Sequence, residues 1–180
     1  YPQIVLELYA DDALADLVAD GFDAGIRLGE CLARDMVALP VSPPQELAVV
    51  ASPAWIATHP VPRDPQDLIG HECVRFRRMH SGRIHPWEFT QDGRDIEVEV
   101  SGRLIVNSGR LARRAALDGL GLAQPLLLEV ASDIAAGRLV RLLRDYTPPF
   151  DGLYVYYPAR EHLPAKLRVF VDFLRGEPAL

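Results

Sequence analysis

The sequence lacks the features that would point to a metal site, a disulfide scaffold or a membrane anchor. Its 180 residues include only two cysteines, Cys31 and Cys73, whose spacing fits no metal-binding pattern. We interpret them as free, buried thiols of a reducing compartment, with a disulfide between them as the less favoured alternative. No apolar run reaches the length of a membrane span, so we expect no membrane association.

An excess of basic charge is also missing. The sequence has 19 basic and 25 acidic side chains, which gives a formal net charge of -6. Nucleic-acid binding needs a basic face for phosphate contacts, so we do not expect this chain on its own to bind DNA or RNA. The hydrophobic content of 49% and the charged content of 24% are typical of a soluble globular protein, and the length suits one large domain or two small ones.

Catalytic motifs are missing as well. The sequence contains no Gly-x-Ser-x-Gly turn, no phosphate-binding loop and no Cys/His signature of a thiol enzyme. His80 and His85 bracket a basic loop, and we interpret both as solvated loop residues in preference to metal ligands. Trp87 and Phe89 are interpreted as core residues of a hairpin in preference to a ligand pocket. We therefore expect a protein that is not an enzyme and holds neither metal nor cofactor.

The sequence does contain a regular alternation of strands and helices. Hydrophobic periodicity and turn residues predict strands over residues 4–9, 22–28, 36–41, 47–52, 73–76, 87–90, 95–106, 120–124, 139–143 and 153–157. Helices are predicted over residues 13–19, from the Ser52-Pro53 start signal, over 125–136 and from Pro164 onward. Such alternation favours an α/β architecture with largely parallel sheets.

The stretch from Asn107 to Pro125 is the most informative part of the chain. Its Gly119-Leu-Gly121 sequence invites comparison with the dinucleotide-binding fingerprint, which requires a strand, then glycines, then a helix. Here the helix comes first and the strand follows, so Gly119 is interpreted as a left-handed residue that ends the helix. The end of this helix that attracts anions is then the opposite one, at Asn107 and Ser108.

Two proline pairs, Pro43-Pro44 and Pro148-Pro149, lie far apart in the sequence. We interpret them as the points where the chain crosses between two lobes. The expected division places residues 1–47 and 152–180 in lobe one and residues 48–151 in lobe two.

Four arginines are candidates for function. Arg27 stands at the carboxyl end of a predicted strand, where open α/β sheets bind ligands, although a local pair with Glu30 is an equal alternative. Arg110, Arg113 and Arg114 lie in the first turns of the predicted helix, where each opposes the helix dipole by at most ~1 kcal/mol. A solvated face, an acidic patch on a partner subunit and an anionic ligand all remain open for these three.

Several motifs, taken in order, resemble one known family. The sequence from residue 1 to about 176 is similar to the effector-binding domain of LysR-type transcriptional regulators, and the motifs that carry the resemblance are residues 22–29, 50–55, 119–125, 136–140 and 157–164. Residues 86–89 and Gln124 further suggest the subgroup that acts on neighbouring metabolic operons.

The resemblance implies a fold of two Rossmann-like lobes joined by two crossovers, similar to type 2 periplasmic solute-binding proteins. A small effector would bind between the lobes. The family's N-terminal winged helix-turn-helix, which would supply all DNA binding, is missing ahead of Tyr1, as are the first strand and helix of the effector domain. Family members are cytoplasmic and assemble as homodimers or homotetramers.

The resemblance also assigns roles to residues. The effector-binding positions would be Arg27, Leu28 and Gly29 from lobe one, and Asn107, Ser108, Gly109, Gln124 and Pro125 from lobe two. Free N–H groups, a helix dipole and one arginine suit a small carboxylate-like anion. The oligomer contact would involve Ile4, Leu6 and Leu8 together with Arg110, Arg113 and Arg114.

Two other functions compete with this interpretation. A solute-binding protein of a transporter would share the fold but would be exported. A small α/β enzyme would need a nucleophile or base constellation, which the sequence does not contain.

Overall fold

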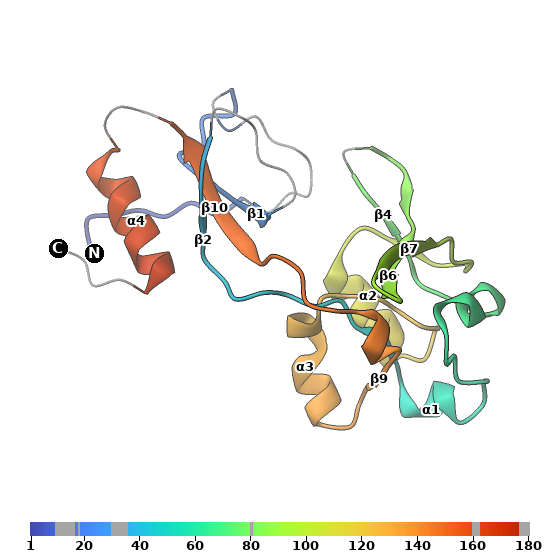
Figure 1. The fold of residues 1–180 in the computed structure, drawn as a ribbon. Helices are drawn as coiled ribbons and strands as arrows, with labels where there is room; N and C mark the ends of the chain where they lie inside the picture. Colours follow the sequence, from blue (N-terminus) through green and yellow to red (C-terminus); the bar gives the residue numbers. More distant parts are fainter. Residues whose placement is uncertain (10–16, 18, 30–35, 80, 160–162, 177–180) are drawn as a thin grey trace. The chain divides into compact units, whose positions relative to one another are not determined.

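The computed structural model describes residues 1–9, 17, 19–29, 36–79, 81–159 and 163–176. The chain divides into two compact units, of which unit 1 comprises residues 1–45 and 150–180 and unit 2 comprises residues 46–149 (Figure 1). The predicted helix over residues 13–19 lies mostly outside the described residues. Glu30, Cys31, His80 and His162 also lie outside them.

Unit 1 is built on a three-stranded antiparallel sheet. Its strands are β1 (Gly25–Leu28), β10 (Leu153–Pro158) and β2 (Met36–Pro40), in the order β1-β10-β2. Helix α4 (Ala165–Arg175) covers this sheet, as Figure 1 shows. Leu167 and Val171 of the helix pack against Val155 and Tyr157 of β10 to form the core of the unit.

Unit 2 contains a central strand that is buried on both faces. Strand β3 (Val49–Ala51) pairs with β9 (Val140–Leu142), and Val50 also bridges Ala123. Along this segment Val49 and Ala51 belong to one buried cluster, whereas Val50 belongs to another on the opposite face. Burial on both faces explains why the sequence here is a continuous apolar run in place of an alternating one.

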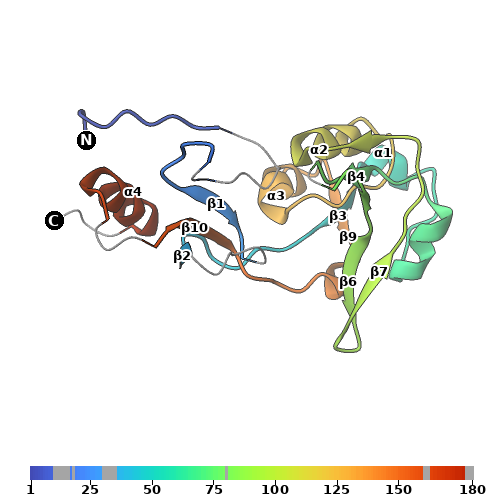
Figure 2. The same ribbon diagram turned by 90° about the horizontal axis from the view of Figure 1, so that it is seen from above.

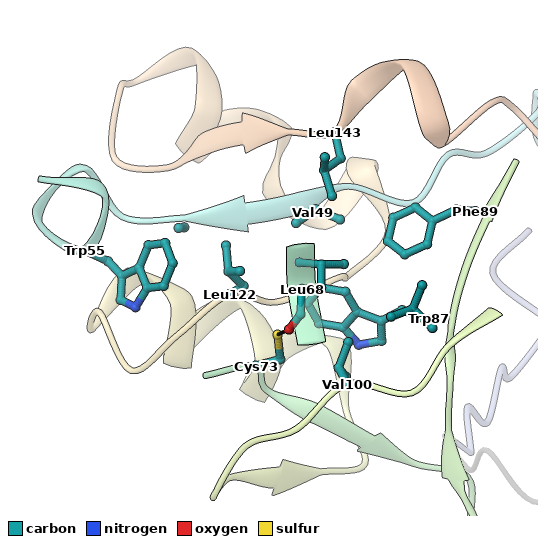
Figure 3. Close-up of a cluster of buried hydrophobic side chains, with 11 residues drawn as sticks. Val49, Trp55, Leu68, Cys73, Trp87, Phe89, Val100, Leu122 and Leu143 are labelled. Carbon is teal, nitrogen blue, oxygen red and sulfur yellow. Dashed lines mark hydrogen bonds between the residues drawn. The ribbon is translucent and has the colours of Figure 1, made fainter. Parts of the chain in front are cut away.

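One face of these strands is covered by aromatic and aliphatic side chains from several short elements. Trp55 comes from α1 (Pro53–Ile56), Leu68 from the 3-10 helix η1 (Pro65–Gly70), and Trp87 and Phe89 from β6 (Trp87–Gln91), as Figure 3 shows. Strand β6 forms a hairpin with β7 (Arg94–Val98). The predicted hairpin and the predicted core role of its two aromatic residues are therefore confirmed.

The other face is covered by two helices, α2 (Gly109–Leu117) and α3 (Leu127–Ala135). The small side chains of Ala112, Ala115 and Ala116 let α2 lie close to the strands. Figure 2 shows both helices on one side of β3 and β9 and the β6–β7 hairpin on the other. The remaining elements of unit 2 are β4 (Arg75–Arg77), β5 (Ile84–His85), β8 (Ile105–Val106) and the 3-10 helix η2 (Arg144–Tyr146).

The expectation of largely parallel sheets is wrong. Among the strand ladders in the described ranges, only β4 and β8 pair in parallel. The reason lies in the path of the chain. Strands β2 and β10 are the segments by which the chain leaves and re-enters unit 1, so they run in opposite directions when they pair.

The predicted strand over residues 4–9 is also wrong. These residues are not part of a strand in the structure, and Val5, Leu6 and Leu8 are exposed. The alternation of side chains is compatible with a strand, but a strand also requires a neighbour to receive its backbone hydrogen bonds, and none of the described residues pairs with this segment.

The outgoing and returning segments of unit 1 pack tightly beyond the sheet. The backbone N–H of Leu153 donates to Ser42 Oγ at 2.8 Å, and Gln45 and Phe150 exchange two backbone hydrogen bonds of 2.9 Å. Gly152 lies so close to the other segment that an added Cβ would overlap the carbonyl oxygen of Pro43 and lie 2.5 Å from Ser42 Oγ. Only a glycine fits there without a backbone shift.

Gly152→Ala should therefore destabilise unit 1. Overpacking of this kind typically lowers the free energy of unfolding by about 1–3 kcal/mol. Urea unfolding followed by circular dichroism would measure the loss. Gly70→Ala is the matched control, because a Cβ at Gly70 would meet open space. Equal unfolding midpoints for the two variants would show that the close approach at Gly152 is not needed.

Candidate functional site

In unit 1, the structure places Arg27 on an aromatic surface. The Arg27 guanidinium carbon lies 5.5 Å from the centre of the Tyr156 ring, within the range of a cation–π interaction. Arg27 is partly buried at the carboxyl end of β1, directly opposite Tyr154 of β10. The side chain is thus held by the sheet, with its charge near the strand end.

The two glycines beside Arg27 make this arrangement possible. Gly25 and Gly29 share the face of Arg27, because side chains alternate along a strand. An added Cβ at Gly25 would overlap the Tyr156 ring, and one at Gly29 would lie 2.9 Å from the Tyr154 ring. Two tyrosines therefore occupy the space that side chains at these positions would fill.

In unit 2, Asn107, Ser108 and Gly109 form the N-terminus of α2. Asn107 is exposed, and Ser108 is the N-cap residue with an extended backbone (φ -146, ψ 133). The Ser108 carbonyl accepts hydrogen bonds from Leu111 and Ala112, but its side chain makes no capping hydrogen bond. The first turn of α2 contains no acidic residue, so the helix does not supply its own counter-charge.

A carboxylate from the neighbouring helix lies at this end of α2. An added Cβ on Gly109 would overlap Glu129 Oε2 and would lie 2.6 Å from Oε1. Glu129 belongs to the first turn of α3 and is partly buried. Glu129 cannot be identified as a neighbour of α2 from the sequence, because nothing in its local pattern distinguishes it from other acidic residues on helix faces.

Two of the three arginines of α2 have partners within unit 2. Arg113 Nε donates to Asp133 Oδ2 at 2.5 Å, and Arg138 Nε donates to Asp133 Oδ1 at 2.8 Å. The Asp133 side chain has no exposed area. Arg114 Nε donates to Asp118 at 2.7 Å, whereas Arg110 is exposed. The arginine face is therefore largely engaged within its own unit.

These pairs move the pKa values of their members in opposite directions. The pKa of Asp133 lies below its usual value of 3.8, first because of the hydrogen bond from Arg113 and then because of Arg138. The pKa of Arg113 is raised, chiefly by the same hydrogen bond, and the charges of Asp133 and Glu129 add to it. Both groups are thus held in their charged forms.

Gln124 contacts a polar cluster that consists of Arg78, His85 and Glu88. Its Nε2 donates to the Glu88 carbonyl at 3.2 Å, and Glu88 Oε1 lies 3.5 Å from both Arg78 and His85. The pKa of His85 is lowered to about 4, mainly by burial and also by the charge of Arg78, so its ring is neutral at pH 7. The interpretation of His85 as a solvated residue is wrong, since its side chain is only 22% exposed. Pro125, the other predicted residue here, is buried.

The interpretation of the glycine pair is confirmed. Gly119 has a φ of +73° and follows Asp118, the C-cap residue of α2, so it ends the helix in the left-handed conformation. Gly121 has a φ of +151°, and an added Cβ there would overlap the carbonyl oxygen of Glu72. Both glycines serve the turn from helix to strand, and neither contributes to a phosphate-binding loop.

Cys73 is a free thiol in the core of unit 2. Burial, with a smaller contribution from the charge of Glu72, raises its pKa to about 12. In the part of the chain that the structure describes, no His, Cys, Asp and Glu side chains gather in a group of three that could hold a metal ion. None of the described helices has the length and apolar character that a membrane crossing needs.

Comparison with known proteins gives a consistent result. The family model of the LysR substrate binding domain matches residues 1–179. A putative transcriptional regulator of Pseudomonas aeruginosa is 43% identical over 175 residues, which cover 97% of this chain and 57% of the relative. The HTH-type transcriptional regulator PgrR of Escherichia coli is 34% identical over 180 residues, which cover 100% of this chain and 60% of the relative. The chain thus spans less than two thirds of the length of these relatives.

Solved structures show the same similarity. The regulatory domain of the C227S variant of AphB from Vibrio vulnificus has a TM-score of 0.82 and 27% identity, covering 98% of this chain and 85% of that one. CrgA, a LysR-type transcriptional regulator from Neisseria meningitidis, has a TM-score of 0.81 and 27% identity, covering 98% of this chain and 59% of that one. These regulatory domains have the type 2 periplasmic-binding-protein-like fold, so the predicted fold class is confirmed.

Removal of the Asp133 charge should destabilise unit 2 in a pH-dependent way. Loss of hydrogen bonds to a charged group costs about 1.5–3 kcal/mol, and we expect Asp133→Asn to lower the free energy of unfolding by that amount at pH 7. Since the folded-state pKa of Asp133 is depressed, its contribution is present above the ordinary value of 3.8 and is lost as the pH falls through the folded value.

Urea unfolding of wild type and variant at several pH values would measure this difference. The stability gap should be constant from pH 7 to about pH 5 and should narrow below about pH 4. Asp118→Asn, which removes an exposed i,i+4 pair on α2, is the control and should have a small effect. A gap that widens on acidification would contradict the assignment.

Cys73 should be chemically inert in the folded protein. A pKa of about 12 leaves very little thiolate at pH 8, so we expect alkylation by iodoacetamide to be on the order of a thousandfold slower than in the unfolded chain. A Cys31→Ser background isolates the signal, and mass spectrometry with and without denaturant would measure the two rates. Rapid labelling of Cys73 in the native protein would disprove the prediction.

Proposed function

The chain belongs to the family of LysR substrate binding domains, and on that premise we propose that it is the ligand-sensing part of a DNA-binding transcriptional regulator. The match over residues 1–179, together with relatives named as transcriptional regulators, carries the proposal. The relatives are longer than this chain, so DNA binding is proposed to come from an N-terminal domain of the full-length protein. The same comparisons favour a cytoplasmic regulator over a transporter's solute-binding protein.

The activity that we propose is binding without catalysis. The relatives are named as transcriptional regulators, which makes a non-enzymatic role the expected one for this family. The polar groups near the candidate site residues also suit binding, because Arg27, Asn107 and Gln124 can hold a ligand but include no nucleophile paired with a base.

The effector is proposed to be a small molecule with at least one anionic group. Arg27 supports this proposal, because a guanidinium binds carboxylates with two parallel hydrogen bonds. Its guanidinium lies over the Tyr156 ring at the end of β1. Asn107 and Ser108 at the start of α2, together with Gln124, are proposed to contact the rest of the molecule. Backbone atoms would then shape the rest of the site, from Leu28, Gly29, Gly109 and Pro125.

The proposed mechanism is a shift between two conformations of the full-length regulator. A ligand shifts such an equilibrium only by the difference in its affinity for the two states. A change from about 1:99 to 99:1 requires about 5.5 kcal/mol of differential binding, which is within reach of an effector that makes several charge-assisted hydrogen bonds.

We propose that this conformational change alters DNA binding by changing how the subunits of a homodimer or homotetramer are arranged. The exposed apolar side chains of Ile4, Leu6 and Leu8 suit a contact with another subunit. Arg110 on α2 is the arginine best suited to join such a contact, because Arg113 and Arg114 pair with acidic residues of their own unit.

Arg27→Ala tests the proposed site. Loss of hydrogen bonds to a charged group costs about 1.5–3 kcal/mol, so the affinity for a small carboxylate that binds should fall about 10- to 100-fold. Isothermal titration calorimetry with a panel of mono- and dicarboxylates on the full-length regulator would measure this change. Arg94→Ala, on the exposed β6–β7 hairpin, is the matched control. Unchanged affinity in Arg27→Ala would remove Arg27 from the site.

A further inference from the structure

Arg75 is a partly buried arginine for which unit 2 provides no partner. It is the first residue of β4, and its Nε atom is buried without a hydrogen-bond acceptor. None of the ion pairs that the described residues form includes its guanidinium. A buried N–H group of a cation without an acceptor lowers the stability of the fold, because the group loses water and gains no hydrogen bond in return.

Arg141 shows how unit 2 holds a buried arginine that supports the fold. Its side chain is only 10% exposed, and its Nε also lacks an acceptor. Its Nη2, however, donates to Glu46 Oε2 at 2.7 Å and to Thr147 Oγ1 at 3.0 Å. These bonds connect β9 to the segments that enter and leave unit 2. Arg75 has no such bond, so the packing of unit 2 gives no structural reason for a charge at its position.

Arg75 lies close to the predicted effector-binding residues of unit 2. Strand β4 runs parallel to β8, which Asn107 follows directly. On the opposite side, Cys73 forms a parallel bridge with Leu122, and Gln124 follows two residues later, at the level of Arg75. The three parallel segments therefore end at one edge, and such edges are where open α/β sheets bind ligands.

The side chain of Arg75 is on the same face as that of Gln124. Cys73 and Leu122 belong to the hydrophobic cluster that Figure 3 shows, whereas the next residue of each segment belongs to the cluster under α2 and α3. Because side chains alternate along extended segments, Arg75 and Gln124 return to the face of Cys73 and Leu122. A guanidinium and an amide thus occupy adjacent positions on one face, and both can donate hydrogen bonds to an anion.

We propose that Arg75 is an effector-binding residue of unit 2 whose guanidinium receives a carboxylate group of the ligand. The inference rests on the proposed function, because Asn107 and Gln124 are effector-binding positions only under that function. A carboxylate accepts two parallel hydrogen bonds from one guanidinium, so it is the partner that this charge lacks among the described residues. Arg75 is then retained for binding at the expense of the stability of the ligand-free protein.

The first experiment measures the melting temperature of the full-length regulator without any effector. Arg75→Met keeps an unbranched side chain but removes the charge, and it should raise the melting temperature by about 2–4 °C, because an apolar group replaces an unpaired buried charge. Arg141→Met is the matched control and should lower the melting temperature, since it leaves Glu46 without its partner. A fall in Arg75→Met like that in Arg141→Met would show that the charge supports the fold and would overturn the inference.

The second experiment uses acetate as the smallest stable carboxylate probe and compares it with chloride at equal ionic strength. Acetate should raise the melting temperature of wild type, and Arg75→Met should lose this shift. Arg75→Lys should keep part of it, because an ammonium group retains the charge but not the two parallel donors. Arg103→Met removes an exposed charge that pairs with Glu72 and should respond like wild type. Equal acetate shifts in wild type and Arg75→Met would overturn the inference.

Calorimetry separates this inference from the proposed function. For a carboxylate that the full-length regulator binds, Arg75→Met should lower the affinity about 10- to 100-fold. If Arg27→Ala weakens binding and Arg75→Met does not, Arg75 is removed from the site and the sensor function stands. If no mono- or dicarboxylate binds to wild type, the proposed effector class is wrong, and the two melting-temperature experiments still decide the role of Arg75.

Discussion

One buried carboxylate, that of Asp133, determines how the two helices of unit 2 lie against each other. Its side chain is inaccessible to solvent and receives hydrogen bonds from Arg113 of α2 and from Arg138, which follows α3. A buried charge without partners would be very unfavourable, so the folded state is restricted to arrangements in which both arginines reach it. That restriction sets the position of α2 along α3. It thereby also sets the position of the first turn of α2, where the candidate effector-binding residues are found.

The path of the chain constrains the direction in which the strands pair. The segments that leave and re-enter unit 1 run antiparallel and exchange backbone hydrogen bonds as far as Gln45 and Phe150. Within unit 2 the pairing of β3 with β9 continues the same relation, and Arg141 supports it by donating to both Glu46 and Thr147. Because of this pairing, the sheets contain more antiparallel neighbours than an alternation of strands and helices predicts. The proline pairs near residues 43 and 148 adjoin these points, since proline suits extended segments outside a ladder.

The sequence allowed correct prediction of features that depend on local chemistry. Ser52 caps α1, the turn between β6 and β7 forms where Gly93 permits it, and Gly119 ends α2, because each depends on residues only a few positions away. Features that depend on distant partners were missed or predicted wrongly. Residues 4–9 alternate like a strand, but a strand requires a neighbour that local sequence cannot supply. Of the candidate site, the start of α2 and Arg27 could be predicted as places of positive potential. The carboxylate of Glu129 could not, because its contact with Gly109 spans twenty residues and depends on helix packing.

This contact also explains why the charge of a binding site cannot be inferred from one helix alone. Taken by itself, α2 with its dipole and three arginines is an anion-binding helix. Helix α3 places Glu129 beside Gly109 and Asp133 beside Arg113, so two carboxylates of the protein itself lie next to the positive groups of α2.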